Sequence, residues 1–193
     1  MKKFLLQQLS VFLLMLFAVA CRQSPVGQEG ALAVVDPMDS NAQLTVVYLV
    51  RHAEKDISDP SNQDPDLTPE GVARAEALRT LLEQQQVDAL YATKYVRTKN
   101  TLKPLAEERK LEVRQYEAHD FQGLKKSILQ NHPGQTVVVS GHSNTLLPIV
   151  EAFGAKRPVP DITEQEYDYL FKVVLTPDGS ATVETDRFGN TAK

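Results

Sequence analysis

The sequence predicts an α/β fold: a three-layer α/β/α sandwich with a mostly parallel central sheet. Short apolar runs alternate with helix-like segments four times between residues 45 and 153, which is the order typical of this class. The runs at 45–50 and 136–139 are almost continuously apolar, as strands covered on both faces are. With 193 residues, the chain is long enough for one such domain with a full core.

The elements follow from local patterns. Strands are expected at 45–50, 87–92, 111–116 and 136–140, and helices at 69–82, 93–108, 121–131 and 144–153. Pro177-Asp178-Gly179 is a turn sequence, so the two segments beside it, 169–175 and 181–188, are predicted to form a hairpin. The connection at 154–168 contains prolines and is expected to border the pocket.

The first helix has the clearest start signal. Thr68 suits the N-cap and Pro69 the first helical position, where a missing N–H costs nothing. Four apolar residues at helical spacing are expected to form its buried face: Val72, Ala75, Leu78 and Leu82.

The N-terminus has the composition of a targeting segment. Lys2 and Lys3 precede an apolar run at 9–19, and Ala18-Val19-Ala20 resembles a signal-peptidase site. The apolar run is short for a membrane span. We therefore expect residues 1–20 to be a signal peptide.

Cys21 follows directly and is the only cysteine, so one chain cannot form an internal disulfide. Its position resembles the lipobox of bacterial lipoproteins, with Ala18 where leucine is usual. We expect Cys21 to be lipidated, residues 21–43 to form a flexible tether, and residues 44–193 to form the domain, held at the bacterial cell envelope by its lipid anchor. The alternative is an ordinary secretory signal in which Cys21 is incidental.

Charge argues against one class of partner. The formal net charge is -4 and no basic stripe occurs along the chain, so a nucleic-acid partner is not expected.

Polar residues appear where two predicted strands stop. Arg51-His52 follows the strand at 45–50, and Gly141-His142 follows the strand at 136–140. Because the carboxyl ends of parallel strands form the usual site of an open α/β sheet, the two histidines are expected to meet there. A neutral histidine with one nitrogen held can attack a phosphoryl group, and arginines can stabilise the charge that develops. Arg97 is placed for a further clamp.

Four motifs in order resemble the histidine phosphatase superfamily, which has the phosphoglycerate mutase-like fold. They are Val50-Arg51-His52-Ala53 with Glu54, Leu67-Thr68-Pro69-Glu70-Gly71, the segment Tyr91 to Thr98 with Arg97 and a later Thr101, and Gly141-His142-Ser143-Asn144. The Arg-His dipeptide alone would be weak, since such a pair at a strand end is more often a surface feature. The four motifs together cover residues 45–153.

The resemblance implies roles. His52 would be the phosphohistidine nucleophile, while Arg51, Arg97 and His142 would bind the phosphoryl group, with Asn144 beside them. The general acid in many relatives is a carboxylate after the third strand, here Glu117 or, as the alternative, Asp120. Some small members lack this acid. The resemblance implies no metal and no organic cofactor. His119 and His132 match no motif and are expected to be structural or exposed.

The implied function is a phosphatase that hydrolyses small phosphomonoesters through a phosphohistidine on His52. One alternative is a phosphoglycerate mutase-type phosphoryl transferase. The expected export of the chain and the short 154–168 segment both argue against this alternative. The other alternative is a non-catalytic module that binds phosphorylated ligands.

Overall fold

The computed structural model describes residues 43–189. The expected signal peptide, the lipidated Cys21 and nearly all of the tether lie outside the described residues. So do the last four residues of the expected domain.

The centre of the described part is a six-stranded sheet in the order β3-β2-β4-β1-β5-β6. Its strands are β1 (Thr45–Arg51), β2 (Ala89–Ala92), β3 (Val113–Gln115), β4 (Thr136–Gly141), β5 (Tyr169–Leu175) and β6 (Ala181–Arg187). β3, β2, β4 and β1 run parallel, and β5 and β6 form an antiparallel hairpin at the edge beside β1. The predicted mostly parallel sheet and its C-terminal hairpin are confirmed.

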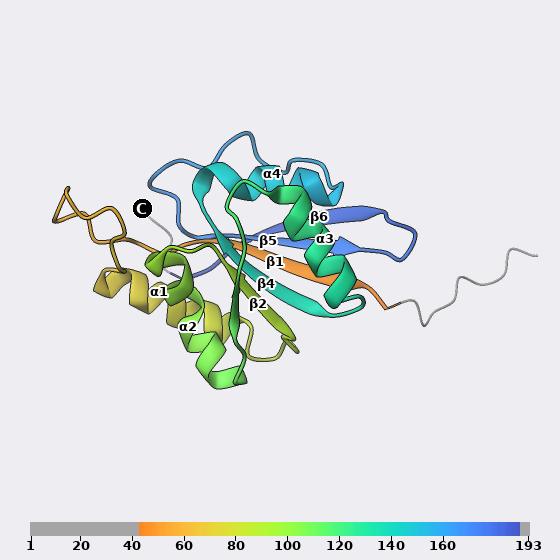
Figure 1. Ribbon diagram of the computed structural model, residues 1–193, viewed down its shortest axis with the longest axis horizontal. Coiled ribbons are helices and arrows are strands. Elements are labelled where there is room, and N and C mark those ends of the chain that lie inside the picture. Colours follow the sequence, from red (N-terminus) through yellow and green to blue (C-terminus); the bar gives the residue numbers. More distant parts are fainter. Residues whose placement is uncertain (1–42, 190–193) are drawn as a thin grey trace, which may run out of the picture. The chain divides into compact units, whose positions relative to one another are not determined.

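Helices cover both faces of this sheet, as Figure 1 shows. They are α1 (Pro69–Leu81), α2 (Val96–Arg109), α3 (Phe121–Asn131) and α4 (Ser143–Phe153). α1 and α2 pack on one face and α3 and α4 on the other, with one apolar core cluster in each layer. The three-layer sandwich predicted from the sequence is therefore the observed architecture.

β1 lies inside the sheet and both of its faces are covered. Val47 and Leu49 pack in the layer of α3 and α4, whereas Tyr48 and Val50 pack in the layer of α1 and α2. Alternate side chains of a strand point to opposite faces, so a strand between two helical layers needs apolar residues at every position. This explains the continuous apolar run that precedes Arg51.

α1 starts as predicted, and three of its four expected inward residues, Ala75, Leu78 and Leu82, are buried. The Thr68 hydroxyl accepts a hydrogen bond from the Gly71 N–H at 3.1 Å, and Pro69 opens the helix. Val72, expected to be inward, is instead 51% exposed, while Arg74 is buried. Arg74 forms an ion pair with Glu54 at 2.7 Å and donates to the Phe188 carbonyl at 2.8 Å. These distant polar partners decide which way the helix faces.

α2 begins three residues later than predicted. Tyr95, its N-cap, has an extended backbone and no side-chain cap hydrogen bond. The Asp64 carboxylate supplies an acceptor instead, 3.0 Å from the Val96 N–H. Residues 93–95 are therefore outside the helix, where they can line a pocket. β2 and β3 are shorter than expected, whereas α4 ends as predicted at Gly154, whose φ of 98° suits glycine.

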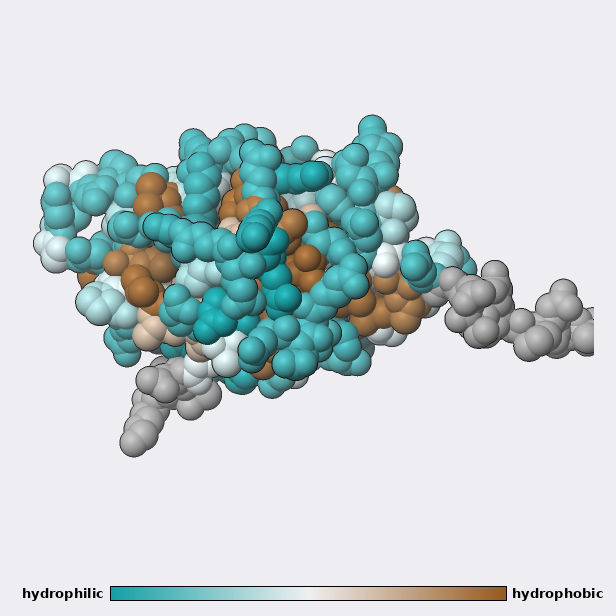
Figure 2. All heavy atoms as spheres, turned by 90° about the horizontal axis from the view of Figure 1, so that it is seen from below, coloured by the Kyte–Doolittle hydropathy of each residue, from teal (hydrophilic) through white to brown (hydrophobic). Residues whose placement is uncertain are grey.

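The surface seen in Figure 2 is largely hydrophilic, with apolar side chains interrupting it in places. Exposed apolar residues on α1 are Val72 and Leu81. Among the described helices, none combines the length and apolar character that crossing a membrane requires.

Candidate active site

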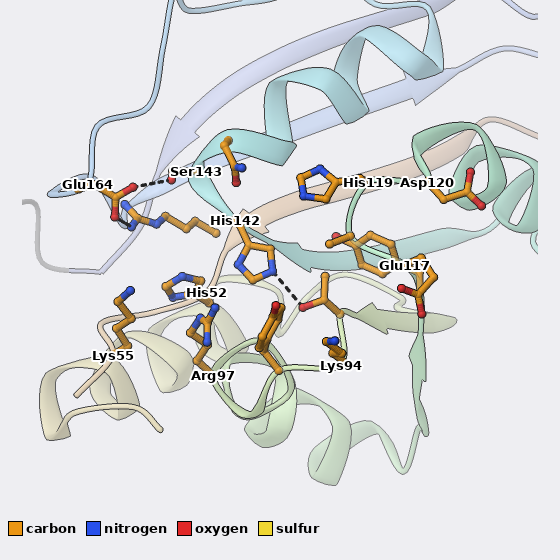
Figure 3. A pocket seen from close by; sticks show the side chains of 16 residues that line it. His52, Lys55, Lys94, Arg97, Glu117, His119, Asp120, His142, Ser143 and Glu164 are labelled. Carbon is orange, nitrogen blue, oxygen red and sulfur yellow. Dashed lines mark hydrogen bonds and ion pairs between the residues drawn. The ribbon is translucent and has the colours of Figure 1, made fainter. Parts of the chain in front are cut away.

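A pocket of about 630 Å³ opens beyond the carboxyl ends of β1, β2 and β4. Figure 3 shows charged side chains from several elements converging on it. Every residue that the sequence suggested for phosphoryl chemistry lines this pocket: Arg51, His52, Arg97, Glu117, Asp120, His142 and Asn144. The strand-end argument therefore placed the two histidines and their neighbours correctly.

His52 is held by a hydrogen bond between its ring and the backbone. Its Nδ1 lies 2.8 Å from the carbonyl oxygen of Ala53. A carbonyl can only accept, so Nδ1 carries the proton and Nε2 keeps its lone pair. The side chain is 3% exposed and its ring lies 5.4 Å from that of His142, centroid to centroid.

The backbone around Ala53 is fixed from two sides. The Ala53 N–H donates to the Thr101 hydroxyl at 2.8 Å, and that hydroxyl donates to the Arg97 carbonyl at the same distance. Next along the chain, the Glu54 carbonyl accepts from the Thr68 N–H at 2.9 Å. A Cβ on Gly71 would stand 2.3 Å from that carbonyl oxygen, so only glycine allows this approach. The Leu-Thr-x-x-Gly motif therefore supports the loop that follows His52.

His142 is held differently, through its Nε2. This atom lies 3.1 Å from the Thr93 hydroxyl, which lies 2.9 Å from the Thr98 hydroxyl. Thr98 donates its own proton to the Tyr95 carbonyl at 2.7 Å. Because the Thr98 hydroxyl uses its proton there, Thr93 must be the donor in the bond between the two hydroxyls. The Thr93 hydroxyl can then only accept from His142, so Nε2 carries the proton in the neutral ring. Nδ1 of His142 is then the unprotonated nitrogen.

Both histidines are neutral around pH 7. Burial lowers the pKa of His52 to about 3, and the positive charge of Arg51 adds to this against the opposing bond to Ala53. Burial also lowers the pKa of His142 to about 4, with Arg97 and Arg51 as the next causes. A neutral His52 has the free lone pair that nucleophilic attack needs.

Arg51 is 2% exposed and is fixed by a segment after α4. Its Nη1 donates to the carbonyls of Thr163 and Glu166, and its Nη2 donates to the Glu164 carboxylate at 2.9 Å. The centroid of the Tyr167 ring lies 4.1 Å from the guanidinium carbon.

Arg97, in the first turn of α2, is held more loosely. Its guanidinium lies 4.3 Å from the Tyr95 ring centroid, and Nη1 is 3.5 Å from the Asp64 carboxylate. In the described part of the chain, the buried Nε atoms of both Arg97 and Arg51 have no hydrogen-bond partner. Because an unpaired buried donor is costly, both arginines have an unmet demand that an oxyanion can satisfy.

The two candidate acids lie beyond His142 when viewed from His52 (Figure 3). Glu117 is exposed on the pocket wall. Asp120, the alternative, caps α3 by accepting from the Gly123 N–H at 2.8 Å. One Asp120 oxygen is therefore occupied by the helix cap, whereas the Glu117 carboxylate has no hydrogen bond to another described residue. His119 also lines the pocket, whereas His132 is buried between Tyr91, Arg114 and Gln135.

Lys55, expected in the loop near the pocket mouth, lines the pocket. Sequence reasoning missed two other charged pocket residues. Lys94 adds positive charge, and Glu164 adds a carboxylate from the connection that was expected only to border the pocket. Lys94 could have been inferred from its place beside motif residues. Glu164 has no local signal, because its role depends on contact with a strand more than a hundred positions earlier. Within residues 43–189, no cluster of three or more His, Cys, Asp or Glu side chains is arranged to hold a metal ion.

Comparison with protein families gives one match. Residues 47–119 match the model of the histidine phosphatase superfamily (branch 1). This similarity to the superfamily covers less than half of the chain. The matched region includes Arg51, His52 and Arg97 but ends before His142. His142 is assigned to the site because it lines the same pocket. A search of curated proteins gives no match.

Solved structures share the fold at low sequence identity. YhfR of Bacillus stearothermophilus is 18% identical with a TM-score of 0.59, covering 77% of this chain and 98% of its own. The protein histidine phosphatase SixA in complex with tungstate is 19% identical with a TM-score of 0.61, covering 74% and 96%. A mycobacterial glucosyl-3-phosphoglycerate phosphatase is 13% identical with a TM-score of 0.58, covering 77% and 100%. At these identities the similarity establishes the fold.

Proposed function

We propose that this domain is a histidine phosphatase that hydrolyses phosphomonoesters through a phosphohistidine intermediate on His52. The observation that carries the proposal is the hydrogen bond between His52 Nδ1 and the Ala53 carbonyl, which leaves Nε2 free in a pocket with two arginines. The names of structurally similar proteins support it, because they include a protein histidine phosphatase and a glucosyl-3-phosphoglycerate phosphatase.

The reaction would proceed in two displacements. In the first, His52 Nε2 attacks phosphorus, an N–P bond forms, and the P–O bond to the leaving group breaks. In the second, water attacks the same phosphorus, the N–P bond breaks, and inorganic phosphate leaves with His52 neutral again. Arg51, Arg97 and His142 would bind the phosphoryl oxygens in both steps, because the transferring group spreads negative charge over them. Asn144 would contact the same substrate from the start of α4.

Glu117 is the proposed general acid for the first step, with Asp120 as the alternative. The leaving oxygen needs a proton only when it is strongly basic. Glu117→Gln should therefore slow an alkyl phosphate far more than p-nitrophenyl phosphate, with Asp120→Asn as the matched variant. If neither variant distinguishes the two substrates, this domain uses no carboxylate from that loop.

The decisive experiment is to trap the intermediate. The purified domain would be mixed with a labelled phosphomonoester, quenched in alkali within milliseconds to seconds, and analysed for acid-labile phosphate on His52. Wild type should yield phosphohistidine and His52→Ala none. If wild type binds phosphorylated ligands without turnover or labelling, the domain is a non-catalytic binding module. If wild type passes the phosphoryl group to a second alcohol faster than to water, it is a mutase-type transferase.

We propose that the mature protein begins at a lipidated Cys21 and that the domain works outside the cytoplasm at the cell envelope. The support is the sequence alone: the cationic start, the apolar run and the single cysteine after Ala18-Val19-Ala20. Fractionation of cells expressing wild type and Cys21→Ser tests this. Wild type should be recovered with membranes and Cys21→Ser in the soluble exported fraction. Equal solubility of the two would exclude the lipid anchor.

A further inference from the structure

The segment after α4 makes contacts that the proposed chemistry does not explain. Residues 163–167, here called the Arg51 cradle, surround the guanidinium group of Arg51 on several sides. The turn is itself ordered, because the Thr163 N–H and hydroxyl donate to the Glu166 carboxylate at 2.9 and 3.0 Å. The Glu166 N–H donates in return to the Thr163 carbonyl at 3.1 Å.

The cradle uses a defined subset of the donors on Arg51. A guanidinium has five N–H groups. Both groups on Nη1 have carbonyl acceptors, at 2.9 and 3.1 Å, and one on Nη2 has the Glu164 carboxylate. The Nε–H, buried and without a partner among the described residues, and one Nη2 N–H remain. The terminal end of Arg51 is therefore held by the protein, and these two donors have no partner among the described residues.

Glu164 also contacts the second strand end. Its other carboxylate oxygen accepts from the Ser143 hydroxyl at 2.9 Å, and Ser143 directly follows His142 as the first residue of α4. Figure 3 shows this carboxylate beside Ser143, joined to it by a dashed line. One side chain therefore bridges the ends of β1 and β4, although it is 69% exposed. The bond to Ser143 is the main cause that lowers the Glu164 pKa, followed by the charge of Arg51 against the cost of burial.

We propose that Glu164 is a positioning residue for the phosphoryl-binding Arg51. Its carboxylate anchors the guanidinium from one end, so that the remaining donors face the substrate in a fixed orientation, and it ties that end of the site to α4. The inference rests on the proposed function, because it assigns Arg51 to the phosphoryl group. The competing hypothesis is that the Glu164 carboxylate competes with phosphate for Arg51, in which case removing the carboxylate would tighten phosphate binding.

Two substitutions at one position separate these effects. Glu164→Gln removes the charge but keeps an acceptor for Arg51, whereas Glu164→Ala removes both. The matched control is Glu184→Ala, because Glu184 is 68% exposed, pairs with Lys172 at 3.1 Å and lies on β6 outside the pocket. Each variant would be measured for kcat and KM with p-nitrophenyl phosphate, for tungstate affinity by calorimetry, and for its melting temperature.

We expect Glu164→Ala to lose about 10-fold in kcat/KM and in tungstate affinity, roughly 1.4 kcal/mol, while Glu164→Gln stays within about 3-fold of wild type. Glu184→Ala should match wild type in both. The proposal is overturned if Glu164→Ala equals wild type, or if it binds tungstate more tightly.

Tungstate binding keeps this test separate from the proposed function. If wild type binds tungstate but hydrolyses nothing, the phosphatase proposal fails and the positioning of Arg51 is still decided by the affinities. If wild type is an active phosphatase and Glu164→Ala is unchanged, only the positioning proposal fails.

Discussion

The ends of β1 and β4 each place a histidine in one pocket, and opposite ring nitrogens of the two histidines carry the proton. At the end of β1, His52 donates a hydrogen bond from Nδ1 to a backbone carbonyl and keeps the Nε2 lone pair. At the end of β4, His142 donates a hydrogen bond from Nε2 to a chain of hydroxyl groups and keeps the Nδ1 lone pair. The comparison teaches that the hydrogen bond behind each ring, more than the residue type or its burial, assigns the role of each histidine.

The largest effect is expected when His52 is removed. His52→Ala should lower kcat by roughly four orders of magnitude or more, because it removes the nitrogen that forms the bond to phosphorus in the proposed mechanism. Turnover of p-nitrophenyl phosphate and alkali-quench labelling measure this. His119→Ala, which removes an exposed pocket histidine, is the control and should retain most activity. An active, well-folded His52→Ala protein would remove the basis of the mechanism.

His142→Ala should have a smaller effect of a different kind. Loss of one preorganised group at the phosphoryl oxygens should cost about 10²–10³ in kcat, or roughly 2.7–4 kcal/mol. Unlike His52→Ala, this variant should still form labelled phosphohistidine, more slowly. A variant that retains full kcat, or one that never becomes labelled, would contradict the division of roles between the two rings.

Oxyanion binding should bring a proton to His142. With Nε2 donating to Thr93, the ring can donate from Nδ1 to a phosphoryl oxygen only as the imidazolium, and a bound dianion raises the pKa that burial has lowered. Calorimetry of tungstate binding near pH 7 in buffers of different ionisation enthalpy should show proton uptake, and His142→Gln should abolish it. Equal heats in all buffers would contradict the donor chain.

The stability of the unliganded domain should depend on pH with a definite sign. Folding lowers the pKa of His52 from 6.5 to about 3 and that of His142 to about 4, so the unfolded chain binds more protons within that window. The stabilisation is present above pH 6.5 and is lost as pH falls towards 4, by at most about 1.4 kcal/mol per pH unit for each histidine. Denaturant unfolding from pH 7 to 4.5 measures this slope. His52→Gln should reduce it, and an unchanged slope would mean that His52 is not held neutral by the fold.

Sequence alone predicted the parts that local pattern controls. Strand periodicity gave the layers, and the motif residues were found because each follows a strand or opens a helix. The inward position of Val72 was wrong, because the ion pair of Arg74 with Glu54 and its bond to Phe188 decide how α1 faces. Hydrophobic periodicity contains no information about such distant polar partners.

The same limit applies to the site. Arg51 was predicted but not the cradle that holds it, and Asp64 was not recognised as the acceptor at the start of α2. Both supporting groups lie in irregular connections, where neither spacing nor composition distinguishes a carboxylate that contacts an arginine from one in solvent. Gly71 is an intermediate case, because the motif identified it and the structure supplied the reason, its contact with the Glu54 carbonyl.

The position of β1 in the sheet has a consequence for how the polypeptide acquires its structure. β1 is the first strand, yet its hydrogen-bonded neighbours, β4 and β5, both come from the second half of the chain. Bringing together segments that lie so far apart in the sequence closes a long loop, which is entropically costly and slows folding. During synthesis, the strand that ends at Arg51 lacks its neighbours β4 and β5 until residues 136–175 have been made, so a nascent chain truncated before β5 cannot assemble this end of the site. Maturation of the domain is therefore a late event, and we expect nearly the whole domain to be needed before any oxyanion can bind.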